Sequence, residues 1–414
     1  MARTPKEPVR IDAKQLGGIK RLRHLLPMLA CLHDAGCDRD TAGNRRLHFD
    51  EYVTLVLLAL TNPLIDSVRA LQQAGALEKI AEQLGVGRFS LGSFSESVRV
   101  FNPEKLREVI VQLAGEMRPV NADPRLGTHL DQALVMADGT VLDAIATVAR
   151  AAWIPFQDGT SKHAWKLHVQ FDFDSFLPTH AQLTDARNSG KSDEKYVLRT
   201  KLKRDCCYVM DRWFAQFTLF NDIAAAGSSY VCRVKESSVF DVVEGGERLL
   251  SDDALKAGVV RDAVVRMGAS SKPSARPDHP IRIVVVETAP HEKRGGRRGK
   301  TAGPRAAGGT VVIATNLLHV PAEIVALIYR HRWSIEVFFR FFKQVLGCRH
   351  LLSQRPQGVM IQVYCAIIAC MLINLWTGAK PTKRTVEMLA FYFAGLASDD
   401  EMLRHIEGLQ KTKA

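Results

Sequence analysis

Near its C-terminal end the chain reads Tyr329-Arg-His-Arg332-Trp-Ser-Ile-Glu336-Val-Phe-Phe-Arg-Phe-Phe-Lys343. At about 100° per residue in a helix, Arg332, Glu336 and Lys343 fall within roughly 60° of Tyr329. The phenylalanines between them predict that another side of this helix is buried against a sheet. A carboxylate framed by two cations and a phenol is unusual for a solvated face. It suits a site that holds a metal ion beside a phosphodiester.

Two aspartates upstream supply further carboxylates. Ala133-Leu-Val-Met-Ala-Asp138-Gly-Thr and Cys206-Cys-Tyr-Val-Met-Asp211 contain short apolar runs, and we expect each to be a buried strand that ends in its aspartate. Phosphodiester cleavage commonly uses two Mg²⁺ ions about 3.5–4 Å apart, held by carboxylates. Asp138 would bridge the ions, and Asp211 and Glu336 would each complete one. Each acid alone is more often a turn residue, a helix cap or half of a surface ion pair, and the combination favours catalysis.

The bulk properties indicate a folded cytoplasmic protein with a polyanionic partner. The chain has 414 residues and a net charge of +12, which favours nucleic acid. The eight cysteines lack metal-ligand spacing and are expected to be reduced thiols. His163, His168 and His180 also lack metal-ligand spacing, and we expect each to be hydrogen-bonded or at the surface. The start of the chain is polar, without a secretory signal, and the apolar segment 359–376 is expected to be a buried core helix rather than a membrane span.

Changes of texture along the chain suggest four regions. Residues 1–128 read as a helical N-terminal region for DNA-end binding, 129–236 with 317–350 as a catalytic core, 237–316 as a β-rich insertion, and 351–414 as a helical C-terminal region. In the core, 163–173 and 177–183 are expected to form a β-hairpin, and 229–234 a further strand. In the insertion, strands are expected at 258–265, 281–287 and 310–314.

A basic segment interrupts the insertion. Residues 292–305 carry six Lys or Arg and one Glu in fourteen positions. Such a segment suits contacts with DNA phosphates, and a solvated charged loop without a partner is an equally good interpretation. The residues predicted to contact DNA are Lys293, Arg294, Arg297, Arg298 and Lys300.

The pattern Tyr329-x2-Arg332-x3-Glu336-x6-Lys343 resembles the Tyr-Arg-Glu-Lys signature of the IS4-type transposases of bacterial insertion sequences. Asp138-Gly-Thr and Val209-Met-Asp211-Arg resemble the two aspartate motifs of that family. The resemblance extends in order over roughly residues 130 to 350. It implies an α/β fold like that of ribonuclease H, a mixed sheet flanked by helices. The first aspartate would lie on the first strand and the second on the fourth, the β-rich insertion would follow the fifth strand, and the glutamate would lie on a later helix.

The same resemblance implies a DDE transposase. Asp138, Asp211 and Glu336 would be the metal-binding triad for two Mg²⁺ ions, with Mn²⁺ as a substitute. Tyr329, Arg332 and Lys343 would hold DNA near the scissile phosphate. The reaction would be hydrolysis at the end of the element, then attack of the freed 3′-OH on target DNA. The implied partners are double-stranded DNA, as terminal inverted repeats and as target, and a second copy of the chain in a homodimer.

Two other functions fit these residues: a catalytically silent DNA-binding protein derived from a transposase, and a nuclease of the same fold that never joins strands. One departure from the family concerns aromatic residues. Some members stack a flipped base on a tryptophan of the insertion, whereas this chain has no tryptophan between Trp213 and Trp333. Phe240 or another ring would have to replace it. Trp333 itself is expected to pack in the core.

Overall fold

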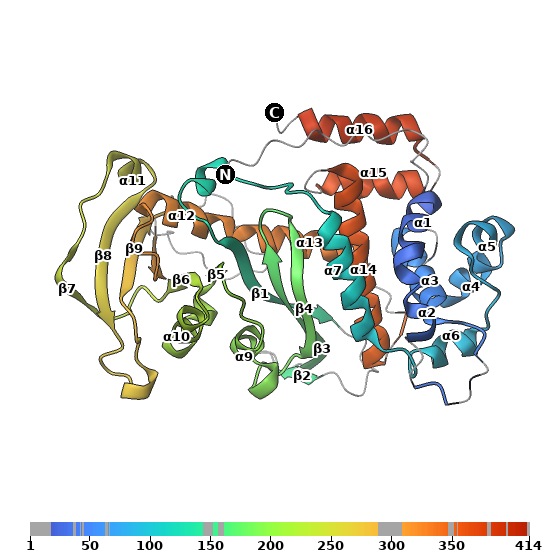
Figure 1. Cartoon of the computed structure of the whole chain (residues 1–414), viewed down its shortest axis with the longest axis horizontal. Helices are drawn as coiled ribbons and strands as arrows, with labels where there is room; N and C mark the ends of the chain where they lie inside the picture. The colour runs from blue at the N-terminus through green and yellow to red at the C-terminus, as the bar shows by residue number, and fades with distance from the viewer. Residues whose placement is uncertain are drawn as a thin grey trace, which may run out of the picture.

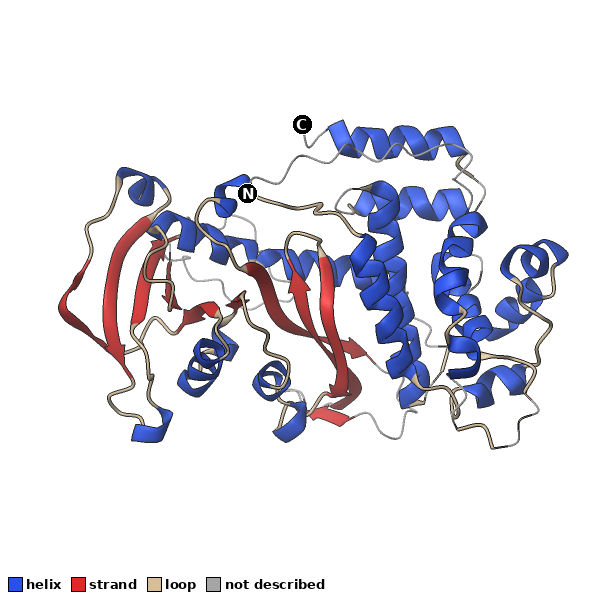
Figure 2. Ribbon diagram, in the orientation of Figure 1, coloured by secondary structure: helices blue, strands red, loops and turns tan. Residues whose placement is uncertain are grey.

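The protein contains a mixed β-sheet with helices on its faces and, beside it, a helical body (Figures 1 and 2). Its computed structural model describes residues 18–35, 39–41, 43, 45–62, 65, 67–143, 152–155, 161–288, 309–346, 352–353, 355–378, 382–394 and 396–411. The predicted DNA contacts Lys293, Arg294, Arg297, Arg298 and Lys300 lie outside these residues.

One sheet contains ten strands of the described part of the chain. They are β1 (Ala133–Asp143), β2 (Ala152–Pro155), β3 (Ser161–Asp172), β4 (Leu177–Asp185), β5 (Cys206–Met210), β6 (Ser229–Val234), β7 (Phe240–Glu247), β8 (Val259–Met267), β9 (Ile281–Glu287) and β10 (Thr310–Thr315). Their order is β2-β3-β1-β5-β6-β10-β9-β8-β7, and β4 also pairs with β3.

The central strands confirm the predicted fold class. In the order β4-β3-β1-β5-β6, β3 is antiparallel to both β1 and β4, whereas β5 is parallel to β1 and β6 to β5. Because β2 is a short addition at the margin, β1 is the first strand of this core and β5 the fourth, as in a ribonuclease H-like sheet. Asp138 lies on the first, and Asp211 directly follows the fourth.

The expectation that the first strand ends at Asp138 was wrong. β1 continues to Asp143, and Asp138 lies opposite Val169 of β3 in the middle of the ladder. The β-branched and apolar residues after Gly139 (Thr140, Val141 and Leu142) favour extended backbone, and β3 is long enough to pair with all of them. The Asp-Gly pair is therefore part of a strand rather than a turn.

The insertion extends the central sheet. The predicted strands near 258–265, 281–287 and 310–314 are present as β8, β9 and β10, and β10 pairs antiparallel with β6 of the core. β7 was not predicted; its sequence holds two adjacent glycines, and its pairing with β8 shifts register between Val242 and Glu247. A short helix, α11 (Asp252–Lys256), lies between β7 and β8.

Helices from both ends of the chain share one core. The N-terminal set is α1 (Gly18–Leu29), α2 (Leu32–Ala35), α3 (Phe49–Thr61), α4 (Val68–Gly75), α5 (Glu78–Leu84), α6 (Leu91–Ser97), η2 (Pro103–Lys105), α7 (Leu106–Glu116) and α8 (Pro124–Gly127). The C-terminal set is α14 (Pro356–Thr377), α15 (Lys383–Phe393) and α16 (Asp399–Lys411). α14 packs against α3, α7 and the sheet strand β4, so the two predicted helical regions meet there. The proposed division into regions stays a prediction.

α14 is long and apolar enough to cross a membrane, and 89% of its most apolar window is buried inside the protein. Its two polar interruptions have partners. The Gln362 side-chain oxygen accepts the Leu352 N–H at 2.9 Å, and the Asn374 amide donates to the Phe176 carbonyl at 3.4 Å. Helix α14 thus packs as a core helix of this fold, as predicted.

Candidate active site

The signature residues lie on two consecutive helices, α12 (Ala322–His331) and α13 (Trp333–Leu346). A single helix was predicted, and that detail was wrong. Arg332 stands between the helices with helical dihedrals (φ −49°, ψ −34°), and its N–H donates to the Tyr329 carbonyl three residues back at 3.1 Å. The backbone therefore tightens for one turn and then continues in nearly the same direction (Figure 1).

Arg332 contacts two of the three candidate acids. Its Nη2 lies 2.7 Å from Glu336 Oε1, and its Nη1 lies 3.8 Å from Asp138 Oδ2. These carboxylates belong to a helix and to a strand that are about 200 residues apart in the chain. One guanidinium therefore joins the acid of β1 to the acid of α13.

The third acid follows from the strand register. Ala137 of β1 pairs in parallel with Met210 of β5, so Asp138 and Asp211 each follow a paired residue, Asp138 within β1 and Asp211 directly after β5. Adjacent strands lie about 4.8 Å apart. Asp211 Oδ1 accepts the Trp213 N–H at 2.8 Å and thereby caps the short helix η4 (Arg212–Phe214). The structure thus places Asp138 and Glu336 at Arg332, and Asp211 at the end of the strand next to Asp138.

Burial, followed by the negative charges of Asp211 and Glu194, raises the pKa of Asp138 to about 7. The Gly139 N–H, which donates to Asp138 Oδ1 at 2.7 Å, and the positive charge of Arg332 act in the opposite direction. Crowded acids of this kind are stabilised by a cation held among them.

A fourth acid, Glu194 of α9 (Glu194–Arg199), was missed by the sequence analysis. It is buried and forms an ion pair with Lys166 Nζ at 2.6 Å, and burial raises its pKa. A Cβ at Gly139 would lie 2.4 Å from Glu194 Oε1, so glycine is needed where this pair approaches β1. Glu194 lies in a polar stretch that carries no motif, so no local signal distinguishes it.

The remaining predicted DNA contacts divide into two groups. Tyr329 is partly buried beside the acids. Burial raises its pKa, and the charges of Arg332, Arg233 and Asp211 also act on it. Lys343 lies on α13 seven residues beyond Glu336, or about 10 Å along the helix axis. The structure brings Tyr329 and Arg332 to the acids and leaves Lys343 two turns away.

Two tryptophans beside the site are exposed. Trp333, the first residue of α13, is 46% exposed, so the expectation that it packs in the core was wrong. Trp213, two residues after Asp211, is 52% exposed.

Among the described residues, His168 and His180 belong to no cluster of metal-ligating side chains. His168 is buried, and its Nε2 lies 2.7 Å from Thr184 Oγ1, while His180 Nδ1 accepts from Arg107 at 2.9 Å. The expectation of satisfied side chains holds for these two nitrogens, but His168 Nδ1 and His180 Nε2 are buried without a hydrogen-bond partner among the described residues. Burial lowers the pKa of both imidazoles to about 4, so both are neutral at pH 7. The His163 side chain lies outside the described residues.

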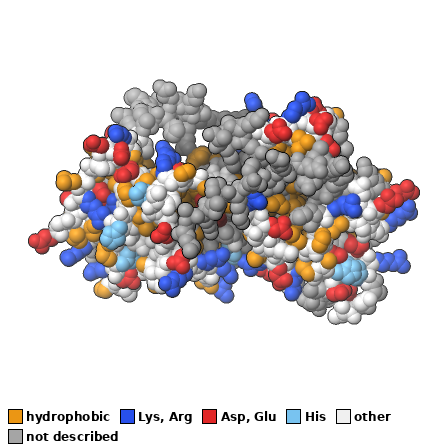
Figure 3. Space-filling model, turned by 45° about the horizontal axis from the view of Figure 1, so that its top comes forward, with side chains coloured by type: hydrophobic (Ala, Val, Ile, Leu, Met, Phe, Trp, Pro, Cys, Tyr) orange, Lys and Arg blue, Asp and Glu red, His pale blue; other side chains and the backbone are white. Residues whose placement is uncertain are grey.

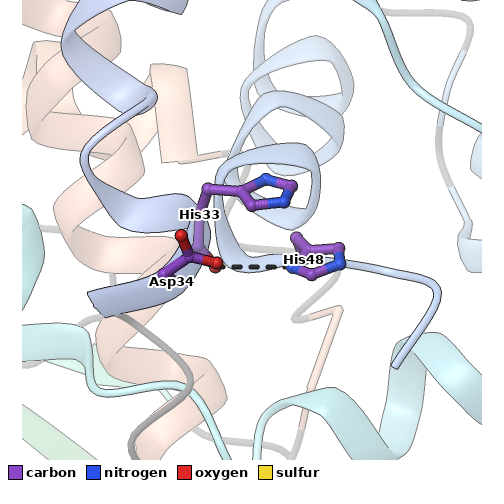
Figure 4. A group of neighbouring side chains, drawn as sticks. All are labelled: His33, Asp34 and His48. Atoms are coloured by element: carbon purple, nitrogen blue, oxygen red, sulfur yellow. Dashed lines mark hydrogen bonds between the residues drawn. The ribbon is translucent and has the colours of Figure 1, made fainter. Parts of the chain in front are cut away.

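A second group of possible ligands lies in the helical body, where His33, Asp34 and His48 approach within 4.8 Å of one another (Figure 4). The two imidazoles stack face to face, with centroids 3.8 Å apart and planes 8° apart. Nitrogen lone pairs lie in the ring plane, so two parallel rings do not both point at one ion. His33 Nδ1 is 3.0 Å from the Asp50 carboxylate, a hydrogen bond that raises the pKa of His33. We assign the group as a stacked pair held by Asp50.

The family profile described as "Transposase DDE domain" matches residues 130–372, more than half of the chain. The chain belongs to the DDE transposase family. All three acids of the site fall within the matched region of this DDE transposase.

A protein of Sinorhizobium fredii described as the transposase y4zB is 28% identical over 226 residues, 55% of this chain and 56% of that relative. A protein of Geobacillus stearothermophilus described as a transposase for the insertion sequence element IS5377 is 24% identical over 313 residues, 74% of this chain and 72% of the relative. The DDE transposase studied here thus spans about half the length of the first relative.

Among solved structures, a piggyBac transposase synaptic complex with hairpin DNA is similar, with a TM-score of 0.40 and 10% identity over 94% of this chain and 81% of that chain. A similarity at this level supports no conclusion about the structure or function of this DDE transposase.

Proposed function

We propose that this protein is the transposase of a bacterial insertion sequence of the IS4 type. It cleaves double-stranded DNA at the terminal inverted repeats of the element and joins the freed 3′-OH to target DNA. The observation that carries the proposal is that Arg332 links Asp138 to Glu336 while Asp211 follows the strand next to Asp138, in a chain of the DDE transposase family.

The donor set fits divalent metal ions. Three carboxylates offer the hard oxygen ligands that Mg²⁺ prefers, and Mn²⁺ accepts the same ligands. Asp138 and Asp211 stand at adjacent strand positions, so Asp138 can share an ion with each of the other acids. Arg332 already holds one positive charge between Asp138 and Glu336, as a bound cation would. Two Mg²⁺ ions at this site would activate the attacking hydroxyl and stabilise the leaving oxygen.

The neighbouring side chains would then position DNA. With Asp138 and Glu336 as metal ligands, the Arg332 guanidinium would be free to pair with a phosphate in its bidentate geometry. Tyr329 would donate its hydroxyl hydrogen to a phosphate oxygen, because the raised pKa keeps the phenol protonated. Lys343, two turns away, would hold a phosphate further along the strand. Lys293, Arg294, Arg297, Arg298 and Lys300 would add contacts from the insertion.

The test uses a supercoiled plasmid that carries the genomic segment bracketing this reading frame. We expect Mg²⁺-dependent cleavage at the segment ends by the wild type and none by Asp138→Ala. The control, Asp253→Ala, removes an exposed acid of α11 that pairs with Lys256, and it should cleave like the wild type. Cleavage that survives in Asp138→Ala would contradict the assignment.

A second variant separates catalysis from binding. Glu336→Gln removes a metal ligand and little DNA contact, so cleavage should be lost while binding to the segment ends stays within a few-fold of wild type. Binding lost in parallel with cleavage would count against its role as a ligand.

A pre-cut end with a free 3′-OH identifies the reaction class. Joining of this end to a second plasmid supports the transposase. Cleavage without joining would instead indicate a nuclease, and end binding without either reaction a silent DNA-binding protein. Analytical ultracentrifugation of the complex with paired ends tests the proposed homodimer, for which two protein copies are expected.

A further inference from the structure

A buried ion pair lies against the residue that follows the first candidate metal ligand. The side chains of Lys166 on β3 and Glu194 on α9 are 13% and 8% exposed, and Lys166 Nζ lies 2.6 Å from Glu194 Oε1. Both reach the same point of β1, because a Cβ at Gly139 would clash with Glu194 Oε1 and lie 2.9 Å from Lys166 Cε. Asp138 is the preceding residue, so a complete ion pair is buried one residue from the candidate metal site.

Glu194 approaches β1 from the face of the sheet opposite to the Asp138 carboxylate. Consecutive residues of a strand point to opposite faces, and Asp138 and Gly139 are consecutive in β1. The Asp138 carboxylate lies 3.8 Å from Arg332, directly before α13, whereas Glu194 reaches Gly139 from α9. This placement favours an electrostatic action of Glu194 on the metal site over direct ligation.

The electrostatics show that the negative end of the pair acts on the candidate metal ligands. Burial makes the largest contribution to the raised pKa of Asp138, and the charges of Asp211 and Glu194 raise it further. Burial also raises the pKa of Glu194; Lys166 opposes this shift, and the charge of Asp211 adds to it. The three carboxylates therefore repel one another, and a divalent cation bound at Asp138 would relieve repulsion with both of the others.

A small void with an unused acceptor adjoins the pair. Asp138, Glu194 and His168 line this void of about 10 Å³, close to the room that one water needs. His168 is 4% exposed, and its Nε2 lies 2.7 Å from Thr184 Oγ1, whose hydroxyl donates to the Asp185 carbonyl at 3.0 Å. Nε2 therefore carries the ring hydrogen, and Nδ1 keeps a lone pair without a partner among the described residues. Two carboxylates and this lone pair all favour positive charge nearby.

We propose that Glu194 is a positioning residue of the metal site. Held by Lys166 behind Asp138, its buried negative charge increases the affinity of the site for a divalent cation, although Glu194 is not itself a ligand. Lys166 balances this charge in the metal-free protein, which allows the acid to remain buried. The inference rests on the proposed metal-dependent function and adds a fourth acid to it.

Direct metal binding tests the inference without DNA or cleavage. The probe is Mn²⁺ at pH 8, with its Kd measured from the electron paramagnetic resonance signal of the free ion. Glu194→Gln keeps the size of the side chain and an acceptor for Lys166, and it should raise the Kd by about tenfold to a hundredfold. Lys166→Gln breaks the same ion pair but leaves the acid, so its Kd should fall or stay within about threefold of wild type.

The comparison of the two partners separates an electrostatic role from a structural one, with urea unfolding in EDTA as the measure of stability. A pair that only supports the fold would make both variants bind Mn²⁺ more weakly to the same extent, and this result would overturn the inference. Lys166→Gln provides this test even where Glu194→Gln does not fold, because a tenfold weaker Kd in it would be decisive. The control Asp40→Asn breaks a pair of similar burial with Arg45 in the helical body, and its Kd should not change.

A further variant identifies the ion that is measured, because Mn²⁺ bound at the candidate site should be lost in Asp138→Asn. If the wild type binds this ion, Glu194→Gln weakens it and no DNA is cleaved, the proposed transposase function is refuted and the role of Glu194 stands. Cleavage by the wild type together with an unchanged Kd in Glu194→Gln would refute the role of Glu194 alone. A wild type without any Mn²⁺ site that depends on Asp138 would refute both.

Discussion

Asp138 is the residue at which folding and function conflict. Its ordinary pKa is 3.8 and its pKa in the folded protein is about 7, so the folded state binds this proton more tightly than the unfolded chain does. The resulting stabilisation is complete below about pH 3.8 and is lost as the pH rises through about 7. Near neutral pH the metal-free protein thus keeps a carboxylate that favours unfolding.

This conflict predicts that Asp138→Asn stabilises the metal-free protein. At pH 8 in EDTA we expect a gain of about 1–4 kcal/mol, taking 1.36 kcal/mol per pKa unit as the upper scale. Near pH 5, where the wild-type acid is largely protonated, the gain should shrink. Urea unfolding at both pH values measures it, with the exposed Asp253→Asn as a control that should change little. A variant less stable than wild type at pH 8 would contradict the assigned environment.

Gly139 provides a steric prediction. In Gly139→Ala the new methyl group would meet Glu194 Oε1 at 2.4 Å and Lys166 Cε at 2.9 Å, which displaces a buried ion pair. We expect a loss of about 1–3 kcal/mol in the free energy of unfolding and reduced cleavage. Gly115→Ala on α7 is the matched control, because nothing lies within 4 Å of its Cβ position. It should gain up to about 1 kcal/mol from helix propensity.

At this scale the sequence could name residue types but not all neighbours. The spacing of Arg332 and Glu336 on helical backbone predicted their proximity, and the order of the motifs indicated which aspartates would join them. Glu194 could not be predicted, because its contact with Lys166 and Gly139 arises only when a helix, a middle strand and the first strand come together. Contacts between side chains of different elements do not produce a periodic pattern in the sequence, so they could not be predicted from it.

At the scale of elements, a buried ion pair joins strands β8 and β9, and its arginine also binds the segment directly before α12. Arg282 of β9 forms two hydrogen bonds of 2.7 Å with Asp262 of β8, and both side chains are almost fully buried. Arg282 Nη1 also donates to the carbonyls of Leu317 and Val320 at 2.9 and 2.5 Å, directly before α12. This arginine therefore positions the helix that carries Tyr329.

We expect Arg282→Met to cost about 3–5 kcal/mol in unfolding free energy, because Asp262 is left buried without a partner. The double variant Arg282→Met/Asp262→Leu should recover most of that loss. The control is Arg261→Met on β8, which breaks an exposed ion pair with Glu247 of β7. Its unfolding free energy should stay within about 0.5 kcal/mol of wild type. Denaturant unfolding compares all three. A small effect of the single Arg282 variant would show that the pair is not what holds α12.

The elements themselves were largely predictable where one periodicity dominates. β6 and β9 coincide with the predicted 229–234 and 281–287, since both are short, mainly apolar runs that are each interrupted by one arginine. β7 escaped prediction because Phe240-Asp-Val-Val-Glu-Gly-Gly-Glu alternates poorly. The tightened turn at Arg332 was equally invisible, since helical spacing alone does not record a switch to three-residue hydrogen bonding.

For the whole molecule, the net charge of +12 is the property that most directly concerns DNA. On the face shown in Figure 3, lysines and arginines of the described residues are interspersed with acids rather than gathered in one patch. We therefore place much of the predicted phosphate contact in the basic segment 292–305.

Replacement of Lys293, Arg294, Arg297, Arg298 and Lys300 by alanine should weaken DNA binding more at low salt than at high salt. Each lost phosphate contact lowers the slope of log K against log salt by about 0.9, so by up to about 4.5 for the five. Titrations between 50 and 200 mM salt measure this slope. Lys256→Ala, an exposed cation paired with Asp253, is the control and should leave it unchanged. An unaltered slope in the fivefold variant would favour a loop without a DNA partner.

The pairing of β10 with β6 has a consequence for scale along DNA. The insertion continues the sheet through backbone hydrogen bonds between β10 and β6. Its outermost strand, β7, therefore lies at a fixed distance from Asp211. Five strand spacings separate β5 from β7, roughly 24 Å, or about seven base pairs of B-form DNA at 3.4 Å each. Hydroxyl-radical footprints should therefore show protection that reaches about that far from the cut, whatever the sequence between.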